Sequence, residues 1–243
     1  MHRVFPSNVL FVLTCVLLAT CSNGIAQTDD VQGQKYVEID RDWMRICGAP
    51  PSPGSVEDEK EIAVLLWLQK TRNTMSVSQG WTDVNVTISS FQEPLGFPIE
   101  MVHMTAFTDA FNAILVEADQ IIFLVKDKVK RKRPYQVIVA LNPAMPLPRS
   151  SSFPSGHGVR GALAAILLGD LFPERRNQLL QRGYFIGDVR VVVGLHYPSD
   201  VEAGKTLGRN LAVEVLKSDA WKGFKEKYSD EIALIKSQIA AND

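Results

Sequence analysis

Apolar residues recur every three or four positions along most of the chain, a spacing typical of helices that bury one face. It predicts helices over residues 56–72, 99–130 and 156–172, of which the second is one long helix or two consecutive ones. Two more helices are expected, one opened by Pro173 and one started by a capping box at Ser199, with a charged helix near the C-terminus. The chain is therefore expected to be mostly helical.

Three stretches depart from this helical spacing. Residues 74–97 contain Gly and Pro breakers and are expected to be irregular. Residues 142–154 contain four prolines and are expected to form a loop. The stretch Phe185–Leu195 is rich in valine, and on propensity alone it could be a buried strand.

The first 26 residues have the pattern of a secretory signal peptide. A short basic start precedes the apolar core Val9–Ala19, and small residues precede Gln27. The core is shorter than the roughly 20 residues that cross a bilayer, so a retained anchor is the weaker interpretation. Lipidation of Cys21 is an alternative, although Thr20 is an unusual residue before a lipoprotein cysteine. The protein is expected to be periplasmic or secreted.

The rest of the chain divides into an arm and one domain. Residues 27–54 are polar and rich in turns and are expected to be an N-terminal arm or linker. Residues 55–243 are expected to form the helical domain, without a transmembrane segment. Signal cleavage would leave Cys47 as the only cysteine, either a free thiol or an intermolecular bridge, without partners for an internal disulfide or a zinc site.

The charges of the chain balance. Its 243 residues include 26 Lys and Arg against 27 Asp and Glu, a formal net charge of −1. A general polyanion binder would show a basic excess, so no nucleic-acid polymer is expected as a partner. Apolar helix faces could be dimer surfaces as easily as core, which leaves a homo-oligomer open.

Six basic residues are concentrated in the segment Lys126–Pro134. Most of this run fits a solvated helix end, where cations meet the negative pole of the helix dipole. Lys126 and Arg133 could differ from the others. If the helix ends between them, their ammonium and guanidinium groups could flank one anion, although the spacing alone is weak support for a site.

A second segment, Pro154-Ser155-Gly156-His157, stands at the expected start of a helix. Ser155 can cap the helix, Gly156 lets the backbone approach a ligand closely, and exposed N–H groups favour an anion. His157 would lie beside that anion site. A lone histidine is usually structural, so this segment gains weight only together with the others.

The third segment contains Arg190, His196 and Asp200. The planar fork of an arginine suits phosphate. A carboxylate four residues after His196 could hold one imidazole nitrogen as N–H and leave the other free to attack. A capping Asp200 beside a surface histidine is the simpler alternative for the segment alone, but three segments with matching chemistry favour a common site.

Together the segments resemble the tripartite signature of the type 2 phosphatidic acid phosphatase and vanadium haloperoxidase superfamily. The matches are Lys126-x6-Arg133-Pro134, Pro154-Ser155-Gly156-His157 and Arg190-x5-His196-x3-Asp200. The signal peptide and the Pro-Pro-x-Pro-Gly-Ser segment further resemble bacterial class A nonspecific acid phosphatases. The resemblance implies an all-α fold, a compact single-domain helical bundle of the acid phosphatase and vanadium haloperoxidase type. It also implies that residues 185–195 form a buried helix and not a strand.

Two positions depart from this family. It commonly has Thr after the Gly-His pair and Ser before the arginine of the third segment, where this chain has Gly158 and Val189. Losing both hydroxyls could loosen the phosphate pocket. Substrate range is therefore less defined than reaction type.

The resemblance also implies the roles of the site residues. It implies His196, His157 and Asp200 as catalytic residues, and Lys126, Arg133, Ser155, Gly156 and Arg190 as phosphate ligands. The implied activity is an acid phosphatase that acts on small phosphomonoesters through a phosphohistidine, with no metal or cofactor and with vanadate as a phosphate analogue. The alternatives are a lipid-phosphate or pyrophosphate phosphatase at the membrane surface, a vanadate-dependent haloperoxidase, and a helical domain that binds an anion without catalysis.

Overall fold

Helices form all the regular structure in the residues that the computed structural model describes, 36–99 and 104–241. They are α1 (Trp43–Cys47), α2 (Val56–Thr71), α3 (Thr74–Thr82), η1 (Ile88–Phe91), α4 (Gln92–Leu95), α5 (Thr105–Val129), α6 (Pro134–Val137), α7 (Gly156–Leu171), η3 (Pro173–Arg175), α8 (Arg176–Val192), α9 (Pro198–Lys217), α10 (Asp219–Lys227) and α11 (Ser229–Ala241). The expectation of an all-α fold is confirmed. The expected signal peptide, residues 1–26, lies outside the described residues, as does His103.

Capping side chains explain where several helices begin. The Ser55 hydroxyl accepts the Asp58 N–H at 3.2 Å and so caps α2. The expectation of irregular structure over residues 74–97 is wrong for α3, which Asn73 caps through the Ser76 N–H at 2.9 Å, and for the short helices η1 and α4. Gly80 lets α3 pack closely against α8, so tertiary contact stabilises a helix that its sequence only weakly favours.

Helices α5 and α9 begin at residues other than those predicted from the sequence. Helix α5 is a single helix that begins at Thr105 and not near residue 99. It ends at Val129, and the C-cap Lys130 has a left-handed φ of 51°. Helix α9 begins at Pro198, with Tyr197 and not Ser199 as its N-cap. Asp200 completes the capping box of this helix, because its carboxylate accepts the Tyr197 N–H at 2.9 Å.

The strand that valine propensity suggested is the second half of α8. Helix α8 packs closely against α7, because Gly161 and Gly183 face each other with no room for a side chain. A Cβ at Gly161 would lie 2.2 Å from the Gly183 carbonyl oxygen. Burial in this tight contact outweighs the β preference of the valines. The helix implied by the resemblance is confirmed as far as Val192, and residues 193–195 form a turn.

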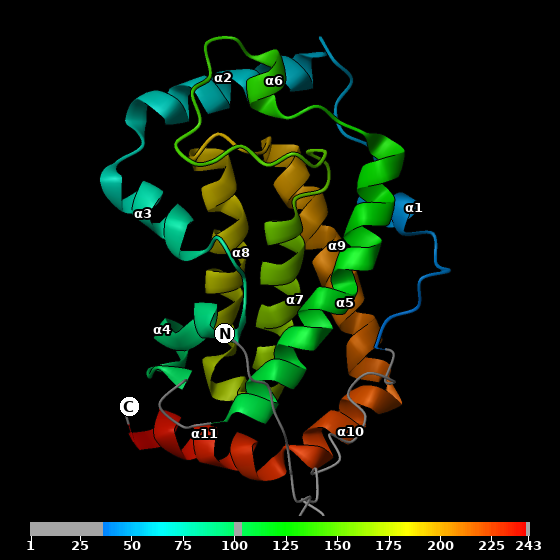
Figure 1. Ribbon diagram of the computed structural model, residues 1–243, viewed down its shortest axis with the longest axis vertical. Coiled ribbons are helices and arrows are strands. Elements are labelled where there is room, and N and C mark those ends of the chain that lie inside the picture. The colour runs from blue at the N-terminus through cyan, green and yellow to red at the C-terminus, as the bar shows by residue number, and fades with distance from the viewer. Residues whose placement is uncertain (1–35, 100–103, 242–243) are drawn as a thin grey trace, which may run out of the picture. The chain divides into compact units, whose positions relative to one another are not determined.

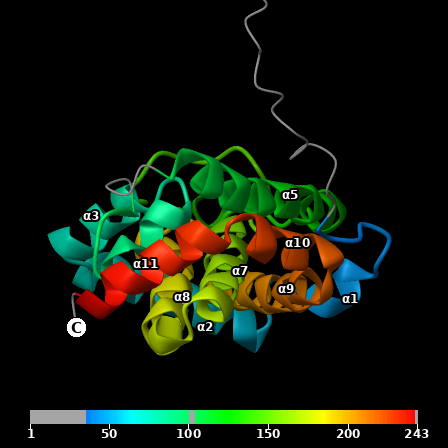
Figure 2. The same cartoon turned by 90° about the horizontal axis from the view of Figure 1, so that it is seen from below.

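Helix α7 is central, with α8 and α9 alongside it and α5 packed across it (Figure 1). Helices α2 and α6 lie over one end of this group, and α10 and α11 run across the opposite end (Figure 2). The C-terminal ends of α5 and α8 and the N-terminal ends of α7 and α9 meet beneath α2 and α6 (Figure 1). All three signature segments therefore come to one end of the bundle.

The described part of the expected N-terminal arm packs against the helices. Trp43 of α1 is buried, and the Tyr36 N–H donates to Glu117 of α5 at 2.9 Å. Cys47 is also buried, which raises the pKa of its thiol to about 12 and weighs against an intermolecular bridge. Within the ranges described, none of the helices combines the length and apolar character needed to cross a membrane.

Candidate active site

A cavity of about 170 Å³ lies where the three signature segments meet. Six of the eight predicted site residues line it: Lys126, Arg133, Gly156, His157, Arg190 and His196. The other two, Ser155 and Asp200, are fully buried: Asp200 contacts His196, and Ser155 caps the helix that begins with Gly156 and His157. The structure thus brings together residues separated by up to 74 positions in the sequence.

His196 is held between a carboxylate and a guanidinium. Its Nδ1 lies 3.3 Å from Oδ2 of Asp200, and its Nε2 lies 2.8 Å from Nη1 of Arg133. An ionised carboxylate can only accept and a guanidinium can only donate, so Nδ1 carries the proton and Nε2 has the lone pair. Burial lowers the pKa of His196 to about 3, against the opposing effect of Asp200. The ring therefore stays neutral and nucleophilic well into the acidic range.

Asp200 accepts hydrogen bonds on both carboxylate oxygens. Besides His196 and the Tyr197 N–H, it accepts the Ser152 hydroxyl at 2.5 Å and Nη1 of Arg131 at 2.7 Å. Burial alone would raise its pKa, but its hydrogen bonds with His196 and Ser152 and the charge of Arg131 lower the pKa to about 2. Asp200 thus remains a carboxylate that fixes the tautomer and orientation of His196.

Two buried cations come from either side of the end of α5. Lys126 Nζ donates to the Ser151 carbonyl at 2.6 Å, and Arg133 Nε donates to the Ser150 carbonyl at 2.9 Å. The left-handed Lys130 ends the helix between them, as the sequence analysis required. Burial, followed by the charge of Arg133, lowers the pKa of Lys126 to about 7. A nearby anion would raise the pKa of Lys126 again. Lys126 and Arg133 are therefore suited to binding an anion.

Arg190 is the third cation, and it is 1% exposed. Its Nη2 donates to the carbonyls of Gly80 at 2.8 Å and Asp83 at 2.9 Å. Its buried Nε has no hydrogen-bond partner among the described residues. A buried donor without a partner is costly, so this atom favours a ligand with an acceptor oxygen in the cavity.

The start of α7 also lines the cavity. Ser155 caps the helix by accepting the Gly158 N–H at 3.3 Å. A Cβ at Gly156 would meet only Ile122, at 3.8 Å, so an anion can approach the backbone N–H groups here.

His157 lies in the first turn of α7. Its Nε2 is 3.2 Å from the Val84 carbonyl, which can only accept, so Nδ1 is the nitrogen that can take up a proton. Burial, followed by the charge of Arg190, lowers the pKa of His157 to about 3.

The two departures from the family pattern have local packing reasons. A Cβ at Gly158 would lie 2.9 Å from the Val201 carbonyl of α9, so a threonine there would need α9 to move away. Val189 is 1% exposed and packs with Met145 and Leu195. Both replacements thus pack α7 and α8 against their neighbours instead of adding hydroxyl groups near the cavity.

Sequence reasoning missed Arg131, which it grouped with the solvated end of the basic run. Lys128, Lys130 and Lys132 are indeed exposed, but Arg131 points inward. Its Nη1 donates to Asp200, and its Nη2 donates to Glu61 of α2 at 2.9 Å. The only signal in the sequence was an arginine among lysines, and a guanidinium is the group that can bond two carboxylates at once.

Arg131 should therefore matter for both folding and catalysis. We expect Arg131→Met to lower the free energy of unfolding by about 3–5 kcal/mol, because it leaves two buried carboxylates without their cation. It should also lower kcat, since Asp200 loses the bond that fixes it. Urea unfolding and steady-state kinetics measure the two effects. Lys132→Met is the matched control, and equal behaviour of the two variants would contradict this role.

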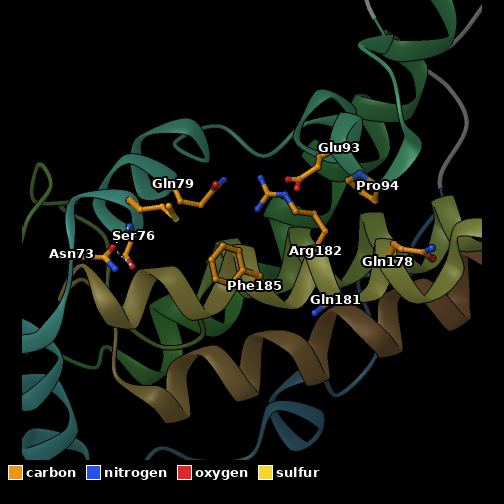
Figure 3. Close-up of a pocket in the computed structure, with 10 residues that line it drawn as sticks. Asn73, Ser76, Gln79, Glu93, Pro94, Gln178, Gln181, Arg182 and Phe185 are labelled. Atoms are coloured by element: carbon orange, nitrogen blue, oxygen red, sulfur yellow. Dashed lines mark hydrogen bonds between the residues drawn. The ribbon is translucent and has the colours of Figure 1, made fainter. Parts of the chain in front are cut away.

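A larger cavity of about 580 Å³ lies between α3, α4 and α8. Figure 3 shows Gln79 of α3, Glu93 of α4 and Arg182 and Phe185 of α8 in its walls. Of the described residues that line it, none is a histidine, and its cation Arg182 is paired with Asp83. It therefore lacks the groups that would act on an anion, although Arg182 helps to hold Asp83, whose carbonyl accepts from Arg190. The smaller cavity is the candidate active site.

The positive charge of the smaller cavity comes from side chains. Lys126, Arg133 and Arg190 all line it. Among the residues in the described ranges, no cluster of three or more His, Cys, Asp or Glu is placed to hold a metal ion.

Comparisons with known proteins place the chain in a family. Residues 100–223 match the model of the PAP2 superfamily. The chain is 39% identical over 187 residues to the acid phosphatase of Zymomonas mobilis, with 74% of this chain and 71% of that protein covered. It is 26% identical over 204 residues to the non-specific acid phosphatase of Providencia stuartii, with 80% and 82% covered.

A solved structure shares the fold. The transmembrane PAP2-type phosphatidylglycerolphosphate phosphatase of Bacillus subtilis aligns with a TM-score of 0.52 at 22% identity, over 76% of this chain and 92% of that chain. The matched family region contains all three signature segments and every residue that the sequence analysis placed in the site. The chain therefore belongs to the PAP2 superfamily.

Proposed function

We propose that the protein is an exported acid phosphatase that hydrolyses phosphomonoesters through a phosphohistidine and without a metal ion. One observation carries the proposal: His196, whose Nε2 has the lone pair and accepts from Arg133, lines a cavity together with Lys126, Arg133 and Arg190. A nucleophile within a cluster of cations suits attack on a phosphoryl group. The acid phosphatase names of its relatives support the same activity.

In the first step, His196 Nε2 attacks phosphorus and the ester oxygen leaves. The three cations, with the backbone N–H of Gly156, neutralise the equatorial oxygens as charge develops on them. The hydrogen bond from Arg133 to Nε2 must pass to the phosphate, which frees the lone pair. Asp200 stabilises the positive charge that the imidazole gains.

In the second step, water attacks phosphorus from the side that the ester oxygen left. His157, having given its proton to the leaving oxygen, now takes a proton from this water. The bond from phosphorus to Nε2 breaks, inorganic phosphate is released, and His196 is neutral again. The cycle needs no other reactant.

Substrate binding itself should favour protonation of His157, the proposed general acid. Burial, followed by the charge of Arg190, depresses the pKa of His157. A phosphate dianion in the cavity offsets the positive charge around His157 and therefore raises its pKa. The proton that the leaving oxygen needs is then taken up together with the substrate, which explains how a group with so low a pKa can act as an acid.

We expect His157→Ala to affect substrates according to their leaving groups. An alkoxide needs a proton, so kcat/KM for an alkyl phosphate should fall by about 10²–10⁴. The p-nitrophenolate ion leaves without one, so p-nitrophenyl phosphate should be affected far less. Steady-state kinetics on both substrates measure the difference. His157→Gln, which can donate a hydrogen bond but not transfer a proton, should behave in the same way, and equal losses on both substrates would exclude the acid role.

The function itself is tested by phosphate release from p-nitrophenyl phosphate with EDTA present, between pH 4 and pH 9. Turnover that survives EDTA supports a metal-independent phosphatase, and vanadate should inhibit it competitively. Turnover lost with EDTA and restored by a metal would contradict the proposal. Detection of the processed chain in the periplasm or medium tests export.

Three other functions predict different results in the same assays. A lipid-phosphate phosphatase would prefer phosphatidic acid in mixed micelles to p-nitrophenyl phosphate. A haloperoxidase would oxidise halide once loaded with vanadate. A binding domain would take up phosphate stoichiometrically without turnover.

A further inference from the structure

The proposed mechanism uses only the buried end of the cavity. Its lining also includes Asp119 and Phe123 of α5, Pro148, and Arg160 of α7. These residues belong to none of the three signature segments. They are placed to meet the group that is bonded to the phosphoryl oxygen.

Helix α5 forms a wall that runs outward from the phosphate-binding end. Asp119, Phe123 and Lys126 stand at i, i+4 and i+7, so they share one face of the helix. Lys126 is 4% exposed, whereas Phe123 is 50% exposed, so the wall reaches from the buried end to solvent. Seven residues of helix rise about 10 Å. That length has room for a phosphoryl group and about one ring.

Helix α7 forms the facing wall, and an ion pair joins the two walls. Arg160 lies one turn after His157 and donates through Nε to Oδ1 of Asp119 at 3.0 Å and through Nη2 to Oδ2. The two side chains are 27% and 22% exposed. The pair therefore borders the cavity at the point on α5 furthest from Lys126.

This border offers both hydrogen-bond donors and an apolar face. A guanidinium has five N–H donors, of which the pair uses two, and the other three have no partner in the described part of the chain. Hydroxyl groups of a leaving group could accept from them. A long alkyl chain would displace water from the ion pair without replacing its hydrogen bonds, which is unfavourable. Phe123 offers an apolar face to one side of a ring.

We propose that the Asp119–Arg160 pair and Phe123 form a leaving-group site that selects a hydroxylated group of about one sugar ring over a long alkyl chain. This inference rests on the proposed function, because it needs a phosphoryl group at the buried end.

The test compares kcat/KM for a hexose 6-phosphate and for decyl phosphate below its micelle concentration. The double variant Asp119→Ala with Arg160→Ala removes the pair without changing net charge. We expect the preference for the sugar phosphate, taken as the ratio of the two values, to fall at least about tenfold. The matched control removes another ion pair, Arg41→Ala with Glu214→Ala, and should leave the ratio unchanged.

A second double variant controls for misfolding. Asp119→Asn with Arg160→Gln removes both charges but keeps a polar side chain at each position, and it should change the ratio in the same direction. An unchanged ratio in a double variant that still hydrolyses p-nitrophenyl phosphate would overturn the inference alone. A parent protein that releases phosphate from no monoester would overturn the proposed function, and the inference with it.

Discussion

Replacing His196 with alanine is expected to lower kcat for p-nitrophenyl phosphate by about 10⁴-fold or more, as removal of a covalent nucleophile does in other enzymes. Nε2 of His196 is the proposed nucleophile, and it lies 2.8 Å from Nη1 of Arg133 in the cation cluster. Its neighbours Arg133 and Lys126 would remain to bind phosphate, so binding should persist while turnover is lost. Steady-state kinetics and isothermal titration with phosphate separate these two effects.

The control must show that the loss is chemical and not structural. Burial keeps His196 neutral, and alanine in its place leaves Asp200 with three other hydrogen-bond donors. The variant should therefore fold, which its far-ultraviolet circular dichroism and its Tm would show. A folded variant that keeps more than about one-hundredth of the parent kcat would contradict the nucleophile assignment.

The second large effect is expected for Asp200→Asn. Asparagine keeps the shape of the side chain but removes the charge that holds His196 Nδ1 as a donor, so the ring can take the wrong tautomer. In a comparable triad, the same change lowers kcat about 10⁴-fold, and we expect about 10³–10⁴-fold here. The variant should also be less stable, because Arg131 loses a fully buried partner. Kinetics and urea unfolding measure both losses.

Asp188→Asn is the matched control for this change. Asp188 also pairs with a cation, Lys205 Nζ at 2.6 Å, but its side chain is 51% exposed. An exposed pair contributes little, so this variant should keep the parent kcat and stability. A kcat within tenfold of the parent for Asp200→Asn would show that Asp200 has no orienting role.

The candidate site was predictable to the extent that its residues stand in short segments. Lys126 and Arg133 flank the end of α5, and His196 and Asp200 flank the start of α9, so local helix boundaries bring each pair together. The sequence could not reveal the partners that tertiary contacts supply. Arg131 reaches Glu61 of α2, 70 positions earlier, and no periodicity encodes such a contact.

The fold was predictable where helical spacing and capping agree, and less so where packing decides. Helix α7 begins at Gly156, as its cap and apolar pattern predicted. Helix α8 needed the family resemblance, because its valines favour a strand, whereas its close packing against α7 at Gly161 and Gly183 favours the helix. Helix α3 was missed for the same reason, since its contact with α8 outweighs a weak local pattern.

The phosphohistidine at His196 is the central claim, and trapping it tests that claim most directly. The protein would be mixed with ³²P-labelled p-nitrophenyl phosphate, quenched within milliseconds in alkali, and digested for mass spectrometry. A phosphoramidate is stable to alkali and labile to acid, so we predict an acid-labile label on the peptide that contains His196, and no label in His196→Ala. Label on another residue, or single-turnover release of phosphate with no labelled protein at any time, would contradict the account.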